Sequence, residues 1–287
     1  MRVFPYAMSR RLTFILLLSA GLYSPGLYAY AQVDDATDIV RRSVDRDWTD
    51  FTARTNYTYQ QEIVERQRNR DGKIAHSDSQ THEIMILGGR PYERLVAKDG
   101  KPLSAQDARK EQAKLDRESA KRQHESGAER IRMERERAED RRFIREIPEA
   151  FNFRLLGTEA VSGQPAWVIE AEPKPGFRPK RSQAKMFQKI RAKIWIEQAT
   201  YHWVKMDANV LETLSFGFGL LRVAPGATLH FEQVHVNGEI WLPSTIHVQA
   251  DARLALVKTT RAEVDVRFSE YKKFQSESRI EGVAETQ

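Results

Sequence analysis

Cysteine is absent from the 287 residues of the chain. No thiol is therefore available as a catalytic nucleophile, as a lipid attachment point or as half of a disulfide bond. This absence excludes a fold held by disulfide bonds and a lipoprotein anchored through cysteine. The core must be stabilised by burial of hydrophobic residues, which make up 40% of the sequence.

Long apolar runs are also scarce. The apolar stretch over residues 12–22 follows Arg10 and Arg11 and is too short to span a bilayer, which needs about 20 apolar residues. Residues 29–31, Ala-Tyr-Ala, supply the small-x-small pattern that a signal peptidase cleaves. The sequence therefore predicts an export signal over 1–31, cleaved near Ala31. The mature protein is expected to be periplasmic or secreted, soluble and without a transmembrane anchor.

The mature chain has no large excess of positive or negative charge. The formal net charge of the whole sequence is +6, and the segment 1–31 contains three arginines and no acidic residue, so residues 32–287 have a net charge of 6 − 3 = +3. This near balance, together with export, argues against nucleic acid as a partner.

The sequence lacks the motifs of the common enzyme and metal sites. It contains no Gly-x-Ser-x-Gly elbow and no phosphate-binding glycine loop. His82-Glu83 begins like a zinc-protease helix but has no second histidine four residues after the first. His230 and His235 are five positions apart, which places them on opposite faces of a regular strand. We therefore expect no catalytic residues, no metal and no cofactor.

What is present is mostly β-sheet patterning. Residues 35–54 predict a helix, with Val40 and Val44 on its buried face. Residues 57–98 predict a meander, and residues 151–271 predict further strands, with the strongest hairpin signal at Asn237-Gly238. About ten antiparallel strands in one domain must curl to avoid exposed edges. We expect an α+β, mainly antiparallel fold: a curved, half-open β-barrel with helices over its mouth, formed as a single domain over 32–287.

Residues 104–146 differ from the rest, because almost every position is charged, Gln or Ala. Residues of opposite charge recur three or four positions apart, which supports a helix, and Ser104 with Asp107 forms an N-terminal capping signal. This charged insert predicts a solvated helical insertion, with Gly127 as a point where it can divide. The alternative is that it forms a docking arm for another protein of the cell envelope.

Two segments resemble a known family. The sequence IRAKIWIEQATYHWVKMDA over 190–208 resembles the hairpin of LolA/LolB-like outer-membrane lipoprotein-sorting proteins, the periplasmic lipoprotein carriers, and EIWLP over 239–243 is similar to the entry of a later strand. The resemblance implies a groove that shields a lipid or the acyl chains of a lipoprotein. Having no cysteine, the chain resembles the soluble carriers of this superfamily and not the membrane-tethered acceptors.

If the chain forms such a groove, strand residues with apolar side chains line it. The candidates are Ile194, Ile196, Val204, Met206, Leu229, Phe231, Ile246 and Val248. The alternative is that the same side chains fill a packed core. The corresponding functions are a non-enzymatic carrier of an apolar ligand, or a non-enzymatic envelope scaffold that docks through residues 104–146.

Overall fold

A computed structural model describes residues 35–54, 56–69, 71–216, 221–254 and 258–274. The predicted export signal over 1–31 lies outside these residues. Among the described helices, none is both long and apolar enough to cross a membrane.

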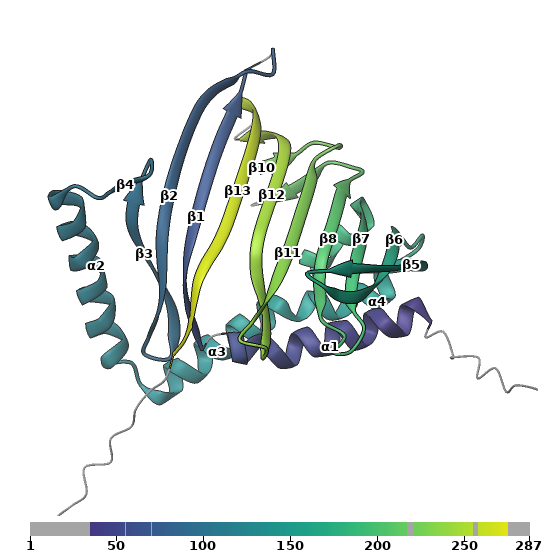
Figure 1. Cartoon of the computed structure of the whole chain (residues 1–287), viewed down its shortest axis with the longest axis horizontal. Coiled ribbons are helices and arrows are strands. Elements are labelled where there is room, and N and C mark those ends of the chain that lie inside the picture. The colour runs from purple at the N-terminus through teal and green to yellow at the C-terminus, as the bar shows by residue number, and fades with distance from the viewer. Residues whose placement is uncertain (1–34, 55, 70, 217–220, 255–257, 275–287) are drawn as a thin grey trace, which may run out of the picture. The chain divides into compact units, whose positions relative to one another are not determined.

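Thirteen strands form one antiparallel sheet (Figure 1). Its order is β4-β3-β2-β1-β13-β12-β11-β8-β7-β6-β5, with the short β10 attached to β12 and β9 attached to β10. The strands are β1 Tyr57–Arg68, β2 Ile74–Leu87, β3 Arg90–Lys98, β4 Lys101–Pro102, β5 Phe151–Val161, β6 Gln164–Pro173, β7 Ile190–Glu197, β8 Trp203–Val210, β9 Leu214–Phe216, β10 Leu221–Val223, β11 Thr228–Val236, β12 Ile240–Leu254 and β13 Lys258–Lys273. The described strands do not close into a barrel, so the predicted α+β class with a half-open, mainly antiparallel barrel is confirmed.

The predicted hairpin between β11 and β12 is present. Asn237 and Gly238 both have positive φ, at 53° and 68°. Two consecutive positive φ values give the tight turn whose twist matches that of the flanking strands, and asparagine and glycine adopt them most easily. The dipeptide therefore fixes this turn locally.

Helix α1 (Ala36–Arg54) packs on the sheet, in contact with β5, β7 and β12. Its buried side chains Ile39, Val40 and Val44 belong to one core cluster with Ile194 and Ile196 of β7. The buried positions on α1 recur at helical spacing, as the sequence predicts. Burying each such aliphatic side chain contributes roughly 1.5–3 kcal/mol, which is why this face of α1 holds to the sheet.

The charged insert is two α-helices followed by a short turn of 3₁₀ helix. The α-helices are α2 (Ala105–Gln123) and α3 (Gly127–Arg141), and the 3₁₀ turn is η1 (Arg142–Glu146). Two further short helices lie outside the insert: α4 (Ile147–Ala150) directly after η1, and η2 (Gln183–Lys189) after β6. The predicted cap of α2 is confirmed, since the amide of Asp107 donates to Ser104 Oγ at 3.1 Å. Ser126 and Glu129 form a capping box that starts α3, so the insert divides just before Gly127.

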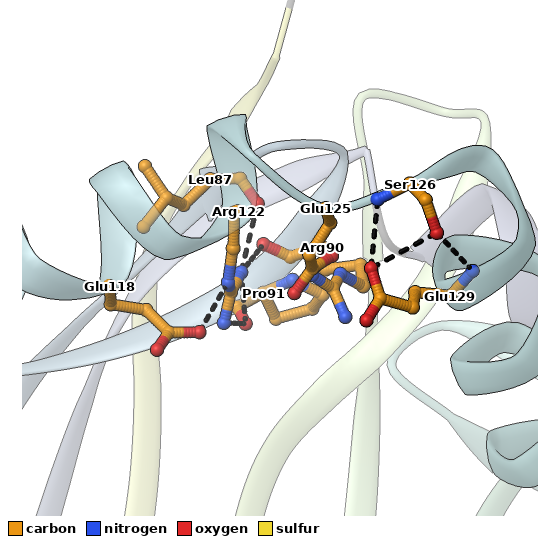
Figure 2. Close-up of polar contacts among 8 residues, drawn as sticks. All are labelled: Leu87, Arg90, Pro91, Glu118, Arg122, Glu125, Ser126 and Glu129. Carbon is orange, nitrogen blue, oxygen red and sulfur yellow. Dashed lines mark hydrogen bonds and ion pairs between the residues drawn. The ribbon is translucent and has the colours of Figure 1, made fainter.

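The first anchor of the charged insert lies at the end of α2 (Figure 2). Arg122 Nη1 donates to the carbonyl oxygens of Leu87 and Arg90 at 2.8 and 3.0 Å, and its Nε donates to Glu118 at 2.6 Å. The helix comes so close that a Cβ on Gly88 would lie 3.3 Å from Arg122 Cβ. Arginine thus replaces water as the donor to carbonyls of the β2–β3 turn.

The second anchor lies at the end of α3. Arg141 Nη2 donates to Asp47 on α1 at 2.5 Å. The guanidinium carbon of Arg145 lies 4.4 Å from the centre of the Trp48 ring, a cation–π contact. Between the two anchors, α3 has no buried residue. The insert is therefore held at the end of α2 and at the end of α3, and α3 is solvated as predicted.

Candidate functional site

Cross-strand pairing places a continuous apolar row on one face of the sheet. Directly opposite residues of antiparallel strands share a face, so each pair extends the row to the next strand. From β7 to β1 the row consists of Ile194, Met206, Phe231, Ile246, Val266 and Ile63. We call this the helix-side face, because Ile194 packs in the cluster that contains the buried side chains of α1.

Burial falls along this row. Ile194 is 2% exposed, beneath α1, whereas the side chains of Met206, Phe231 and Ile246 are half-buried. Val266 and Ile63 at the far end are also half-buried. The row therefore begins as packed core and continues as an apolar surface that solvent reaches.

A second apolar row lies beside the first on the same face. It consists of Ala192, Ala208, Leu229, Val248 and Val264. On β1 it ends at Glu65, which pairs with Val264. The two rows together make the apolar part of the helix-side face and span β8, β11, β12 and β13.

The opposite face, here called the outer face, is charged. Lys193, Asp207, His230, His247 and Asp265 are consecutive partners across five strands. His230 Nδ1 lies 2.5 Å from Asp207, and His247 Nδ1 lies 2.5 Å from Asp265. At the level of these rows, the sheet is therefore apolar on the helix-side face and charged on the outer face, because successive side chains of a strand point to opposite faces.

The outer face also contains a cluster of possible metal ligands. One ligand atom from each of His247, Glu263 and Asp265 lies within 4.8 Å of the others. Arg66 binds both carboxylates, and Arg68 binds Glu263 at 2.5 Å. Burial acts to raise the pKa of Asp265, but hydrogen bonds from Arg66 and His247 outweigh it and hold that pKa below its ordinary value. Two guanidinium groups already neutralise these acids, so the cluster is an ion-pair network.

The structure separates the eight candidate groove residues into three groups. Met206, Leu229, Phe231, Ile246 and Val248 lie in the half-exposed parts of the two rows. Ile194 and Ile196 lie on the same face but are buried in the core cluster beneath α1.

Val204 is the exception. It is fully buried in a different cluster, with Trp195 and Trp241. The β7–β8 register shifts between Trp195 and Ile196, which pair with Lys205 and Trp203. The extra residue turns Val204 away from Met206, and an alternation pattern contains no signal for such a bulge.

Sequence reasoning did not select Ile63, Val264 and Val266, although they complete the two rows. The signal for Val264 and Val266 was available, because they alternate with Asp265 and Arg267. Which strands neighbour β13 could not be read from that alternation. Only the pairing of β13 with both β12 and β1 brings these residues to the helix-side face.

A buried polar group that sequence reasoning also missed joins α1 to the β7–β8 turn. His202, 4% exposed, has Nε2 2.6 Å from Asp50 and Nδ1 2.5 Å from Thr200 Oγ1. The Thr200 hydroxyl also donates to Glu197, whose carboxylate accepts the amides of Ala199 and Thr200 at 2.8 Å each. The order of threonine, histidine and aspartate resembles a catalytic triad. Here, however, the hydroxyl closes a turn and the histidine is enclosed, so the group has a structural role.

Comparison with known proteins gives matches among solved structures alone. No family model matches the chain, and no curated protein matches it. The structure is similar to that of a DUF1329 family protein from Desulfovibrio piger, with 14% identity, 83% of this chain and 93% of the other covered, and a TM-score of 0.33. A putative outer membrane lipoprotein-sorting protein domain from Vibrio parahaemolyticus has 9% identity, coverages of 81% and 92%, and a TM-score of 0.29. A LolA superfamily protein from Nitrosomonas europaea has 12% identity, coverages of 83% and 92%, and a TM-score of 0.29.

Proposed function

We propose that this chain is exported and binds an apolar ligand, a lipid or the acyl chains of a lipoprotein, on the helix-side face of its sheet. The observation that carries the proposal is the half-exposed row Met206, Phe231, Ile246, Val266 and Ile63, continuous across five strands. The export part rests on the predicted signal over 1–31.

The energetics of this face favour an apolar occupant. Contiguous apolar surface on a soluble protein often marks a binding site, whereas single exposed apolar residues are ordinary. An acyl chain gains about 0.8 kcal/mol for each methylene group that it buries, so eight methylenes against this face contribute roughly 6 kcal/mol. Met206 and Phe231 adapt well to irregular chains, since methionine is flexible and phenylalanine offers a large flat surface. The charged outer face offers no such gain.

The alternative is a non-enzymatic scaffold that docks on an envelope protein through residues 104–146. One observation favours it: α3 has no buried residue, so most of its surface before the anchor at Arg141 is available to a partner. Its charges are balanced, with five arginines against four glutamates and one aspartate over 127–141. Because the charges are balanced, α3 favours neither an acidic nor a basic partner, and we place this function second.

The test is ligand binding by the full mature chain. We expect native mass spectrometry of protein purified from the periplasm of an export host to show bound lipid. We also expect the fluorescent fatty acid cis-parinaric acid to bind the delipidated protein. A clean apo mass together with no uptake of cis-parinaric acid would reject the carrier function.

Two neighbouring substitutions locate the site. Ile246→Asn places a polar group in the helix-side row, and we expect it to weaken cis-parinaric acid binding about tenfold, since 1.4 kcal/mol corresponds to a factor of ten. Thr245→Asn lies on the outer face of the same strand, beside Arg267, and serves as the matched control. Equal binding by the two folded variants would show that the ligand does not use this face.

A further inference from the structure

The loop between β6 and η2 belongs to the most basic part of the chain. Residues 174–185, which comprise this loop and the start of η2, contain five basic residues and no acidic residue. They are Lys174, Arg178, Lys180, Arg181 and Lys185. A run of like charges is usually solvated and repels itself. This basic loop is different, because it is folded against η1, at the end of the charged insert, and against α4, which follows it.

Backbone hydrogen bonds fix the loop in place. The amide of Lys174 donates to the carbonyl of Ala150 at 2.9 Å, and the amide of Phe177 donates to the carbonyl of Lys174 at 3.2 Å. The Phe177 side chain is buried in the core cluster. The amide of Lys180 donates to Glu146 Oε2 at 2.8 Å. The backbone of Lys180 is therefore positioned by the fold before any ligand arrives.

An open hollow of about 550 Å³ lies between this loop and the segment η1–α4. Its lining is entirely charged: Arg142, Arg145, Lys180 and Arg181, with Glu146 and Glu149. Four cations and two carboxylates give the lining a formal charge of +2. The lining shares no residue with the two apolar rows, so the hollow is a separate site from the helix-side face.

Neighbouring side chains hold the arginines of this hollow in place. Glu139 bridges two of them, 2.8 Å from Arg142 and 3.2 Å from Arg181. Arg145 is held by its contact with the Trp48 ring. Each guanidinium has five N–H donors, so these contacts leave most of the donors available to a ligand. Acids therefore position the arginines without consuming their hydrogen-bonding capacity.

We propose that this hollow binds a phosphate group, either on a free phosphate ester or on a lipid headgroup. A phosphate presents several oxygens to several donors at once, and arginine forks match it with paired hydrogen bonds. The inference is independent of the carrier function, because it uses different residues and a different ligand chemistry.

The binding test uses the full mature chain and named probes. We expect inorganic phosphate and glycerol 3-phosphate to bind in isothermal titration calorimetry at low salt if the source is a free ester. If the source is a lipid headgroup, we expect co-sedimentation with phosphatidylglycerol vesicles and not with phosphatidylcholine vesicles. Binding of neither the free probes nor the vesicles would overturn the proposal.

Variants decide whether the hollow is the site. Arg145→Gln combined with Arg181→Gln should weaken binding of the successful probe at least tenfold. Arg132→Gln combined with Arg135→Gln is the matched control, because both are exposed arginines of α3, and Arg132 pairs with Glu136 at 3.8 Å. Circular dichroism checks that each variant is folded. Equal loss in the two double variants would show a general charge effect and would also overturn the proposal.

Discussion

The guanidinium of Arg122 lies 2.8 Å from the carbonyl oxygen of Leu87, and this hydrogen bond joins α2 to the turn between β2 and β3 (Figure 2). The Arg122 side chain is 12% exposed, so the contact is largely withdrawn from water. The hydrogen bond from Arg122 also lowers the pKa of Glu118 below its ordinary value. One arginine thus fixes the end of α2, midway along the charged insert.

Replacing Arg122 by alanine should loosen α2 while the sheet stays folded. The variant loses hydrogen bonds from a charged donor, each contributing about 1.5–3 kcal/mol. The local loss should raise amide exchange rates in α2 roughly tenfold to a hundredfold. Hydrogen exchange with mass spectrometry measures this, and Lys121→Ala, an exposed neighbour, is the control. Unchanged exchange in α2 would show that the helix is held by other contacts.

The buried His202 should make stability depend on pH. Burial lowers the pKa of His202 below its ordinary value of 6.5, and the hydrogen bond with Asp50 offsets this only in part. The unfolded chain therefore binds a proton at this residue at a higher pH than the folded chain does. Stability is then at its full value above about pH 6.5 and falls as the pH decreases below it. Urea unfolding at pH 7.5, 6.5 and 5.5 measures the slope.

The matched variants for this prediction are two histidine substitutions. His202→Gln should flatten the slope between pH 7.5 and 5.5, at some cost in stability at every pH. His124→Gln changes an exposed histidine at the end of α2 and should leave the slope unchanged. The interpretation fails if both variants keep the wild-type slope.

Two glycine substitutions should change stability in opposite directions. Gly238 has φ of 68°, where a Cβ costs about 1–2 kcal/mol, so Gly238→Ala should destabilise by that amount. Gly127 begins α3 outside the left-handed region with open space around it, and Gly127→Ala should stabilise by about 0.4–1 kcal/mol. Neither added Cβ meets a neighbour within 4 Å, so backbone conformation alone determines whether each substitution stabilises or destabilises the protein. Chemical denaturation measures the free energy of unfolding of each variant. If both substitutions raise it, or both lower it, this reasoning is contradicted.

The features that the sequence predicts well depend on neighbouring residues. The Asn237-Gly238 turn, the cap formed by Ser104 and the buried stripe of α1 all follow from chemistry within a few positions. The open antiparallel sheet follows from the number of strands and from the need to bury one face of each. These predictions required no knowledge of which strands are neighbours.

The features that it predicts poorly depend on long-range pairing or on a single inserted residue. Val204 leaves the expected row because the β7–β8 register shifts, and no alternation pattern records such a shift. Ile63 joins the row only because β1 pairs with β13. The contact of the basic loop with the segment after α3 is likewise a property of the folded chain, which local sequence does not record.

The pairing of β1 with β13 also determines when the protein can fold. Tyr57 pairs with Lys273, 216 positions later (273 − 57). Until β13 has been synthesised, β1 and β12 are open edges with exposed backbone donors and acceptors, and such edges promote aggregation. Closure of so long a loop makes formation of the sheet a late and slow event. The last strand therefore links the two halves of the sheet, and chains truncated before Lys258 should be removed by proteases or aggregate.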